Sequence, residues 1–164
     1  MTSAIFSLCA SHATVEKALR QSITESEDNN TSAYQQQQTK FKDSACLVKA
    51  LADIGYTQVE VHETPQQLTG YHGDLRAQRA NIIVRRQFVG GSSNDLGFIK
   101  TEDGTYQAII SDYDLHKHNA LWMTSLTKSY AEHGLIKQAK AQGLIFMGKK
   151  ISAAGKPQLQ FAVR

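Results

Sequence analysis

The stretch LGFIKTEDGTYQAIIS, residues 96–111, contains two strand-like runs joined by a turn sequence. Leu96 to Lys100 and Tyr106 to Ser111 are rich in aromatic and β-branched residues, which are typical of strands. Between them, Glu102-Asp103-Gly104-Thr105 contains the Asp-Gly pair of tight hairpins, because glycine adopts the positive φ that such turns require. The stretch therefore predicts an antiparallel β-hairpin.

Segments with helical and strand-like patterns precede this hairpin. Asp43 or Ser44 is placed to cap a helix that ends at Gly55 in a left-handed conformation. A strand is predicted from Val59 until Thr64-Pro65, since a proline restricts the residue before it and interrupts regular structure. Ala80 to Phe88 is predicted to be another strand.

The helical period returns from about Leu115 to Gln142, with Gly134 as an expected break and Gly143 as the expected end. The core candidates of this segment are Leu121, Trp122, Leu126, Tyr130, Leu135, Ile136 and Ala139. A second hairpin is predicted after it, made of Leu144 to Ile151, a turn from Ala153 to Lys156, and an alternating strand with Leu159, Phe161 and Val163.

This order of elements predicts an α+β fold, with a mainly antiparallel sheet and helices packed on one face. Ser11 to Ser22 has helical spacing, whereas Glu25 to Ser32 and the tract Gln35 to Gln38 are polar and of low complexity. Such segments cannot bury enough surface to offset their ordering entropy, so they predict a flexible linker. Residues 1–39 are therefore expected to be a short helix and a linker, and residues 40–164 a single α+β domain.

Composition sets outer limits on the class of protein. The chain has 164 residues, of which 41% are hydrophobic and 20% charged, so it can bury a core. A net charge of +3 permits contact with nucleic acid or acidic proteins without requiring it. Two isolated cysteines, Cys9 and Cys46, predict free thiols in a reducing compartment such as the cytoplasm. No apolar run approaches the roughly 20 residues of a membrane span, so no membrane insertion is expected.

Glycine, carboxylate, arginine and aromatic residues gather at the ends of the predicted strands. They occur in the segments Tyr71 to Arg76, Ser92 to Phe98 and Ser111 to Asp114. Loops held by rigid strands position polar groups for binding. We predict a binding surface on this sheet rim, formed by Tyr71, His72, Asp74, Arg76, Asn94, Asp95 and Asp112.

Asp112, Asp114, His116 and His118 form the pattern Asp-x-Asp-x-His-x-His where a strand gives way to a helix. Carboxylate and imidazole groups are ligands for zinc, manganese or iron. A helix that starts near Leu115 would, however, turn the two histidines apart. The favoured alternative is a helix N-terminus capped by one of the two aspartates, and no metal or other cofactor is expected.

A basic segment offers a different interpretation, because phosphate contacts and base stacking use arginine and aromatic side chains. The residues concerned are Arg76, Arg79, Arg85 and Arg86, with Tyr71, Phe88, Tyr106 and Tyr113 nearby in the sequence. Against it, Arg85 and Arg86 are expected on opposite faces of a strand. The competing interpretation is a solvated sheet edge protected by charge.

Several segments resemble, in order, an uncharacterised family that includes the product of hypothetical chloroplast open reading frame thirty-five and cyanobacterial relatives. Phe41-Lys42-Asp43, Gly70 to Arg76, Ser93 to Phe98 and Asp112-Tyr113-Asp114 carry the resemblance, which covers most of Lys40 to Gly143. It implies relatedness but no catalytic residues, because that family is itself a domain of unknown function. Residues 1–39 look like an addition to the family's domain.

The sequence contains no pattern that specifies a reaction. The loop at Ser92 and Ser93 has neither the Gly-x-Ser-x-Gly nor the Walker arrangement. We therefore predict a non-enzymatic binding or assembly factor with a protein partner. A nucleic-acid-binding module is the alternative, and a metal-dependent enzyme comes third.

Overall fold

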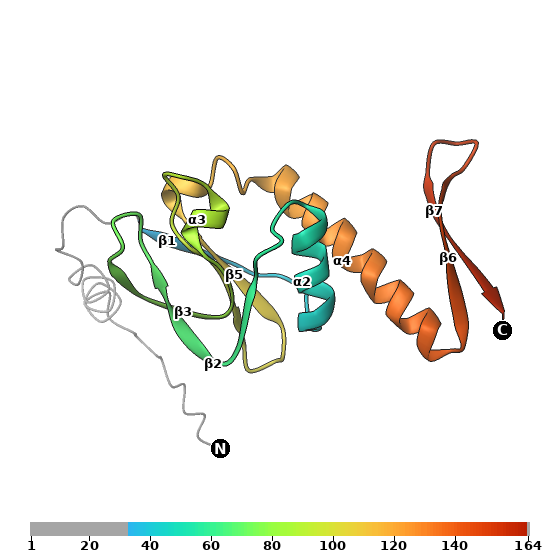
Figure 1. Ribbon diagram of the computed structural model, residues 1–164, viewed down its shortest axis with the longest axis horizontal. Coiled ribbons are helices and arrows are strands. Elements are labelled where there is room, and N and C mark those ends of the chain that lie inside the picture. Colours follow the sequence, from blue (N-terminus) through green and yellow to red (C-terminus); the bar gives the residue numbers. More distant parts are fainter. Residues whose placement is uncertain (1–32, 164) are drawn as a thin grey trace, which may run out of the picture. The chain divides into compact units, whose positions relative to one another are not determined.

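The structure, a computed structural model, describes residues 33–163 (Figure 1). The helix predicted between Ser11 and Ser22, the thiol of Cys9, and the segment from Glu25 to Ser32 lie outside the described residues.

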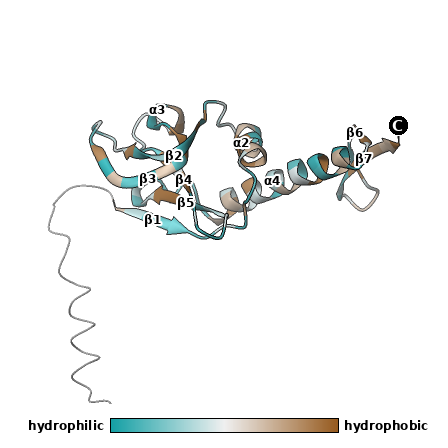
Figure 2. Cartoon of the chain, turned by 90° about the horizontal axis from the view of Figure 1, so that it is seen from below, coloured by the Kyte–Doolittle hydropathy of each residue, from teal (hydrophilic) through white to brown (hydrophobic). Residues whose placement is uncertain are grey.

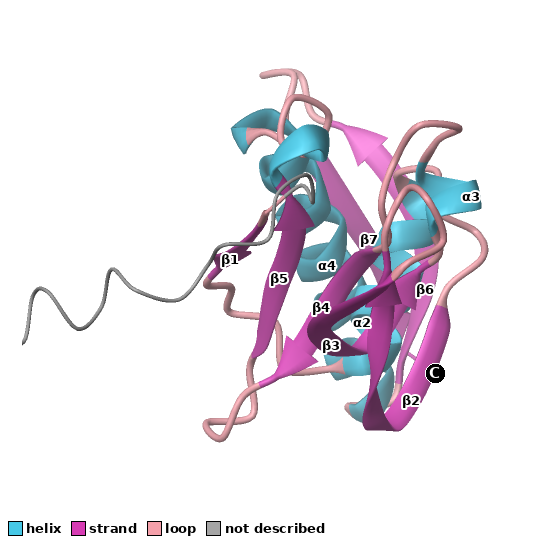
Figure 3. Cartoon of the chain, turned by 90° about the vertical axis from the view of Figure 1, so that its left-hand side faces the viewer, coloured by secondary structure: helices cyan, strands magenta, loops and turns pink. Residues whose placement is uncertain are grey.

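A five-stranded antiparallel sheet forms the centre of the domain, in the order β1-β5-β4-β3-β2. Its strands are β1 (Tyr34–Gln37), β2 (Glu60–Thr69), β3 (Leu75–Val84), β4 (Leu96–Lys100) and β5 (Tyr106–Ser111). A separate two-stranded sheet contains β6 (Leu144–Ile151) and β7 (Pro157–Val163). Helices α2 (Ser44–Asp53) and α4 (Ala120–Ala141) lie behind the strands of the larger sheet in Figure 3. The predicted α+β class is confirmed.

Both predicted hairpins are present. β4 and β5 pair from Gly97 with Ile109 to Lys100 with Tyr106, and Gly104 in the turn has φ +82°. β6 and β7 form the C-terminal hairpin, which a turn with positive φ at Gly155 closes. Positive φ costs glycine little, so the Asp-Gly signal was sufficient to locate the first turn.

The glutamine tract forms a strand instead of the predicted linker. Gln35 to Gln37 pair in register with Ile110 to Ala108 of β5 and form one edge of the sheet. Figure 2 shows β1 in hydrophilic colours. A polar segment is stable here because its backbone pairs with a buried apolar strand while Gln35 and Gln36 remain exposed.

β2 forms the opposite edge, and it does not end at the predicted Thr64-Pro65. It continues through Pro65 to Thr69, with a register shift between Val61 and Gln66. An edge strand with a bulge tolerates proline because the missing N–H need not pair with a neighbour.

β3 is shorter at its C-terminal end than the predicted strand from Ala80 to Phe88. It ends at Val84, and a short helix, α3 (Arg86–Val89), follows. Arg85 is the extended residue that precedes this helix, so the expectation that Arg85 and Arg86 lie on opposite faces of a strand is wrong. The turn into α3 directs this part of the chain toward the rim.

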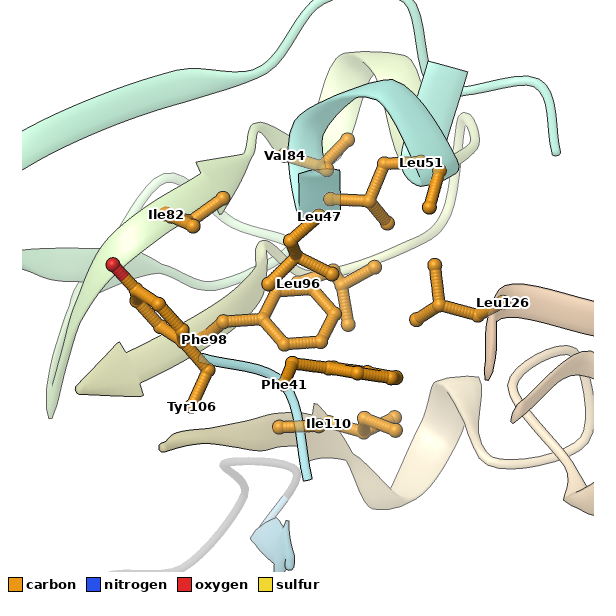
Figure 4. Close-up of a cluster of buried hydrophobic side chains, with 12 residues drawn as sticks. Phe41, Leu47, Leu51, Ile82, Val84, Leu96, Phe98, Tyr106, Ile110 and Leu126 are labelled. Atoms are coloured by element: carbon orange, nitrogen blue, oxygen red, sulfur yellow. The ribbon is translucent and has the colours of Figure 1, made fainter. Parts of the chain in front are cut away.

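Helix α2 begins and ends as predicted. The Asp43 carboxylate accepts a hydrogen bond from the Cys46 N–H at 2.9 Å, which satisfies one of the free amides of the first turn. Gly55 follows the helix with φ +108°. Figure 4 shows Leu47 and Leu51 of this helix packed over side chains of the sheet.

The main core lies between the sheet and the two long helices. Its buried residues are Phe41, Leu47, Ala50, Leu51, Ile82, Val84, Leu96, Phe98, Tyr106, Ala108, Ile110 and Leu126 (Figure 4). Leu126 comes from α4, so this one side chain connects the helix to the centre of the core. Large side chains that are completely buried each stabilise the fold by roughly 1.5–3 kcal/mol.

A second, smaller cluster fills the opposite face with Leu68, Ala80, Ile83 and Ile109. Gly97 of β4 allows close approach here, since a Cβ at this position would lie 2.8 Å from the Ala80 Cβ. The C-terminal part of β2 packs against the start of β4, where Asp95 N donates to Thr69 O at 3.0 Å. This packing brings the β2–β3 turn to the rim that contains the β3–β4 loop.

Helix α4 is continuous through Gly134, so the predicted break is absent, and Gly143 follows its end with φ +78°. Among the predicted core residues, Leu126 and Ala139 are buried, and Trp122, Tyr130 and Ile136 are partly buried. Leu121 and Leu135 are instead 78% and 56% exposed. Figure 1 shows the C-terminal part of α4 running past the five-stranded sheet toward β6.

Candidate functional site

Three segments that are distant in sequence meet at one end of the sheet. The β2–β3 turn and the start of β3 contribute Asp74 and Arg76, the β3–β4 loop contributes Asn94, and the end of β5 with the short 3-10 helix after it (Asp112–Asp114) contributes Ser111 and Asp114. Tyr34 of β1 lies opposite Ser111 in the strand register. We call these six residues the rim cluster: Tyr34, Asp74, Arg76, Asn94, Ser111 and Asp114.

Asn94 connects these segments. Its side-chain nitrogen donates to Ser111 Oγ at 2.9 Å, and its backbone N–H donates to Asp114 Oδ2 at 3.0 Å. Its side-chain oxygen accepts the Tyr71 N–H at 3.0 Å and faces Arg76 Nη2 at 3.5 Å. Asn94 is only 1% exposed, so its role is to hold the rim loops together.

Asp114 is a buried carboxylate that the cluster keeps ionised. Burial alone would raise its pKa, but hydrogen bonds from the Asn94 N–H and from Ser93 and Ser111 lower the pKa below its usual value. Ser111 Oγ donates to Asp114 Oδ2 at 2.9 Å. The other carboxylate oxygen, Oδ1, is buried and has no hydrogen-bond partner within residues 33–163.

Arg76 and Asp74 form a partly buried ion pair over Gly70. The Arg76 Nε and Asp74 Oδ2 atoms are 2.9 Å apart, and Arg76 is 8% exposed. This contact is an ion pair by distance but is not aligned as a hydrogen bond, so Arg76 Nε has no hydrogen-bond partner among the described residues. The other oxygen of the carboxylate, Asp74 Oδ1, is also buried without a partner there. A Cβ at position 70 would lie 2.3 Å from Arg76 Nε, which explains why glycine occupies this position.

Tyr34 completes the cluster from the edge strand. Its hydroxyl is buried without a hydrogen-bond partner in the described part of the chain. Burial, followed by the negative charge of Asp95, raises the pKa of Tyr34 well above its usual value. Buried polar atoms are almost always paired in proteins, so the unpaired atoms concentrated here distinguish this end of the sheet.

Asp95 has a structural role, although the sequence suggested a binding role. Its side chain is 0% exposed and accepts hydrogen bonds from the Thr69 N–H at 2.8 Å and the Arg86 N–H at 2.6 Å. Arg85 Nη1 lies 2.9 Å from Asp95 Oδ2, and Arg85 Nη2 lies 2.7 Å from Glu60 Oε2. These contacts join β2, β4 and α3 directly behind the rim.

The accessible part of the rim is a cleft of about 250 Å³ lined by Tyr71, Ser92, Asn94 and Tyr113. The two tyrosines are 44% and 49% exposed. Each has a histidine against its ring: the Tyr71 and His72 ring centroids are 4.8 Å apart, and those of Tyr113 and His116 are 5.8 Å apart. The cleft has aromatic sides and a polar floor.

The four residues of the Asp-x-Asp-x-His-x-His pattern are dispersed. Asp112 and His116 are exposed, whereas Asp114 and His118 point into separate buried environments. Residues 33–163 contain no group of three or more His, Cys, Asp or Glu side chains that could hold a metal ion. The predicted cap is also wrong, because Asn119 caps α4 by accepting the N–H groups of residues 121 and 122.

His118 is part of an aromatic contact between α2, α4 and the loop that precedes α4. Its Nε2 lies 2.8 Å from the Tyr56 hydroxyl, and its ring centroid is 4.6 Å from that of Trp122. Burial lowers the pKa of His118 to about 4, so the side chain is neutral at pH 7. His118 therefore serves packing at the N-terminal end of α4.

The four arginines do not form a basic surface. Arg76 and Arg85 are paired with carboxylates, and Arg79 contributes a hydrogen bond to the Pro65 carbonyl at 3.5 Å. Tyr106, expected as a stacking residue, is 6% exposed in the core. The arrangement therefore lacks the continuous positive face that binding along a phosphate backbone uses.

A family model described as "Protein of unknown function (DUF1257)" matches residues 50–159, about two thirds of the chain. The chain belongs to the DUF1257 family. The match includes the β2–β3 turn, the β3–β4 loop and the end of β5, which carry the rim cluster apart from Tyr34 of β1. No curated protein and no solved structure matches the chain.

The predicted rim loops lie together at one end of the sheet, but their side chains differ in surroundings. Tyr71, Asp74, Arg76 and Asn94 are brought together, while His72 and Asp112 remain exposed beside the cleft. The predicted set lacked the cleft residues Ser92 and Tyr113, the partly buried Tyr34, and the buried residues Ser111 and Asp114. An exposed aromatic residue immediately after a strand was the available signal for Tyr113.

Proposed function

We propose that this DUF1257 protein is a non-enzymatic binding or assembly factor that uses the rim cleft to recognise another protein. The observation that carries the proposal is the pair of exposed tyrosines, Tyr71 and Tyr113, which line one cleft together with Asn94, a residue held in place by buried hydrogen bonds. Tyrosine is enriched at the centres of protein interfaces, because it buries a large area at small cost in conformational entropy. A rigid floor reduces the ordering cost of binding further.

The nucleic-acid alternative has weaker support, since two of its four arginines are held in ion pairs. A metal-dependent enzyme is the least supported, because Asp114 and His118 face different surroundings. The proposal also places the protein in the cytoplasm, or in the plastid stroma if the source is an alga. The buried free thiol of Cys46 is compatible with a reducing compartment. No helix within residues 33–163 is sufficiently long and apolar to cross a membrane.

Site-specific photo-crosslinking tests the proposal. The photoreactive residue p-benzoylphenylalanine replaces Tyr71, Tyr113 or, as a control, Phe88, which is exposed to a similar extent (46%) but does not line the cleft. Each protein is expressed in its native host and irradiated in lysate with and without nuclease. We expect a discrete crosslinked protein from positions 71 and 113 and none from position 88, unchanged by nuclease.

Two results would contradict the proposal. The same crosslinks from all three positions, or none from any, would show that the cleft is not a preferred contact surface. Crosslinks that disappear after nuclease treatment would instead favour the nucleic-acid alternative.

A further inference from the structure

We infer that the rim cleft binds the guanidinium group of an arginine side chain on the partner, between the rings of Tyr71 and Tyr113. This inference rests on the proposed function and specifies the chemistry that the cleft recognises. Two features support it: the tyrosines that line the cleft, and the carboxylates of the rim, two of which have a buried oxygen without a donor among the described residues.

The aromatic sides favour a planar cation. Tyr71 and Tyr113 line the same cleft and are about half exposed. The face of a tyrosine ring attracts a cation within about 6 Å of its centroid, by about 0.5–1 kcal/mol at an exposed site and more when water is excluded. Guanidinium is planar and weakly hydrated, so it stacks on aromatic rings more readily than an ammonium group.

The charges around the cleft also favour a positively charged ligand. Asp74, Asp112 and Asp114 contribute three carboxylates, against the cations of Arg76 and Lys117. Arg76 is held by Asp74, whereas Asp112 and Asp114 form no ion pair with any residue in the range 33–163; Lys117, which donates to Ser93 Oγ, forms none either, which leaves two carboxylates against this one cation. A group with positive charge would therefore gain favourable electrostatic energy at this rim.

The unpaired atoms behind the cleft add a need for donors. Asp74 Oδ1 and Asp114 Oδ1 are buried acceptors that lack a donor within the described residues, and both belong to the cluster organised around Asn94. Guanidinium has five N–H donors and no acceptor. Through bridging water, it can supply donors to these two carboxylate oxygens, while Arg76 Nε is an unpaired donor of the same cluster and the Tyr34 hydroxyl can donate or accept. An anionic ligand would instead meet carboxylates and would increase their repulsion.

The inference is tested with three short peptides, acetyl-Gly-X-Gly-amide with X as arginine, citrulline or lysine, titrated into the ¹⁵N-labelled full-length protein. Citrulline has nearly the shape of arginine but no charge, so it isolates the charge. We expect saturable shifts of the amide signals of residues 71, 92, 94 and 113 with arginine, in the millimolar range for a single side chain. Citrulline should bind about tenfold more weakly, equivalent to about 1.4 kcal/mol, and lysine should lie between the two.

Variants distinguish the ring from the hydroxyl. Tyr113→Leu removes the π face and should weaken arginine binding about tenfold, whereas Tyr113→Phe retains the face and should bind within about twofold of the parent protein. Phe88→Leu is the matched control outside the cleft and should leave the affinity unchanged. The ¹⁵N spectrum of each variant reports whether it is folded before the titration.

Equal binding of arginine and citrulline, tighter binding of lysine than of arginine, or an unchanged affinity in Tyr113→Leu would each overturn the inference. These outcomes are distinguishable from failure of the proposed function. Crosslinking at positions 71 and 113 without discrimination against citrulline would leave a protein-binding cleft with a different ligand. Absence of both crosslinks and peptide binding would remove both proposals.

Discussion

Replacing Asp95 with alanine should destabilise the domain strongly, although Asp95 lies in a loop segment that the sequence assigned to the binding surface. Its carboxylate accepts the N–H groups of Thr69 and Arg86 and pairs with Arg85, and it is completely buried. Alanine would leave two buried donors and one cation without this partner. A buried donor without a partner costs about 1–3 kcal/mol, and removal of one member of a buried ion pair costs about 3–5 kcal/mol.

Arg85 is partly exposed and also bonds to Glu60, which compensates for part of the lost charge pair. We therefore expect Asp95→Ala to lower the free energy of unfolding by about 3–5 kcal/mol, a large part of the 5–15 kcal/mol available to a typical domain. Asp95→Asn retains one acceptor oxygen and should cost about half as much. The exposed control Asp112→Ala should change stability by less than about 0.5 kcal/mol.

Urea unfolding followed by circular dichroism measures these differences, with the slope of the transition checked for two-state behaviour. The reasoning is refuted if Asp95→Ala unfolds within about 1 kcal/mol of the parent protein, because the hydrogen bonds at this carboxylate would then contribute little. A cost for Asp112→Ala as large as that for Asp95→Ala would also refute it, since the difference in burial would not matter.

Three further outcomes follow from packing and titration. Gly70→Ala should lower the free energy of unfolding, measured in urea, by about 1–3 kcal/mol, because the new Cβ would lie 2.3 Å from Arg76 Nε. The control Gly91→Ala should leave this free energy unchanged, because a Cβ at position 91 meets no atom within 4 Å. The pKa of His118 is lowered by burial from 6.5 to about 4, so the unfolded state binds the proton more readily between these values. The free energy of unfolding should therefore fall by about 2–3 kcal/mol as the pH decreases from 6.5 to 4, and this fall should be smaller in His118→Asn. If the parent protein and His118→Asn both show the same flat pH profile, His118 does not control stability in this range. Phe161→Ala removes an aromatic pair across β6 and β7, with ring centroids 5.7 Å apart, and should increase amide exchange in this hairpin while the central sheet keeps its protection.

Local signals in the sequence were sufficient for most elements of the fold. The Asp103-Gly104 turn, the Asp43 cap and the left-handed Gly55 each depend on interactions between residues a few positions apart. Chain-local chemistry of this type can be predicted because no distant partner is needed. The second hairpin was predictable for the same reason, from alternation in β7 and the glycine in its turn.

Errors occurred where a distant segment decides the local conformation. The glutamine tract is polar along its length, and it becomes a strand only because β5 presents an unpaired edge to it. Pro65 lies within β2 because the strand is an edge strand with a bulge, and edge position is a property of the whole sheet. Leu121 and Leu135 have helical spacing, but burial requires an element opposite them.

The sequence by itself determined which loops form the rim, because their composition of glycine, carboxylate and aromatic residues is visible without coordinates. Only the tertiary structure decided the role of each side chain there. Asp95 and Asp112 are the same residue type in similar loops, yet one is buried against three donors and the other is exposed. The difference arises because β2 folds back onto the start of β4, which brings Thr69 to Asp95 across 26 positions of sequence, and no local pattern encodes such a distant contact.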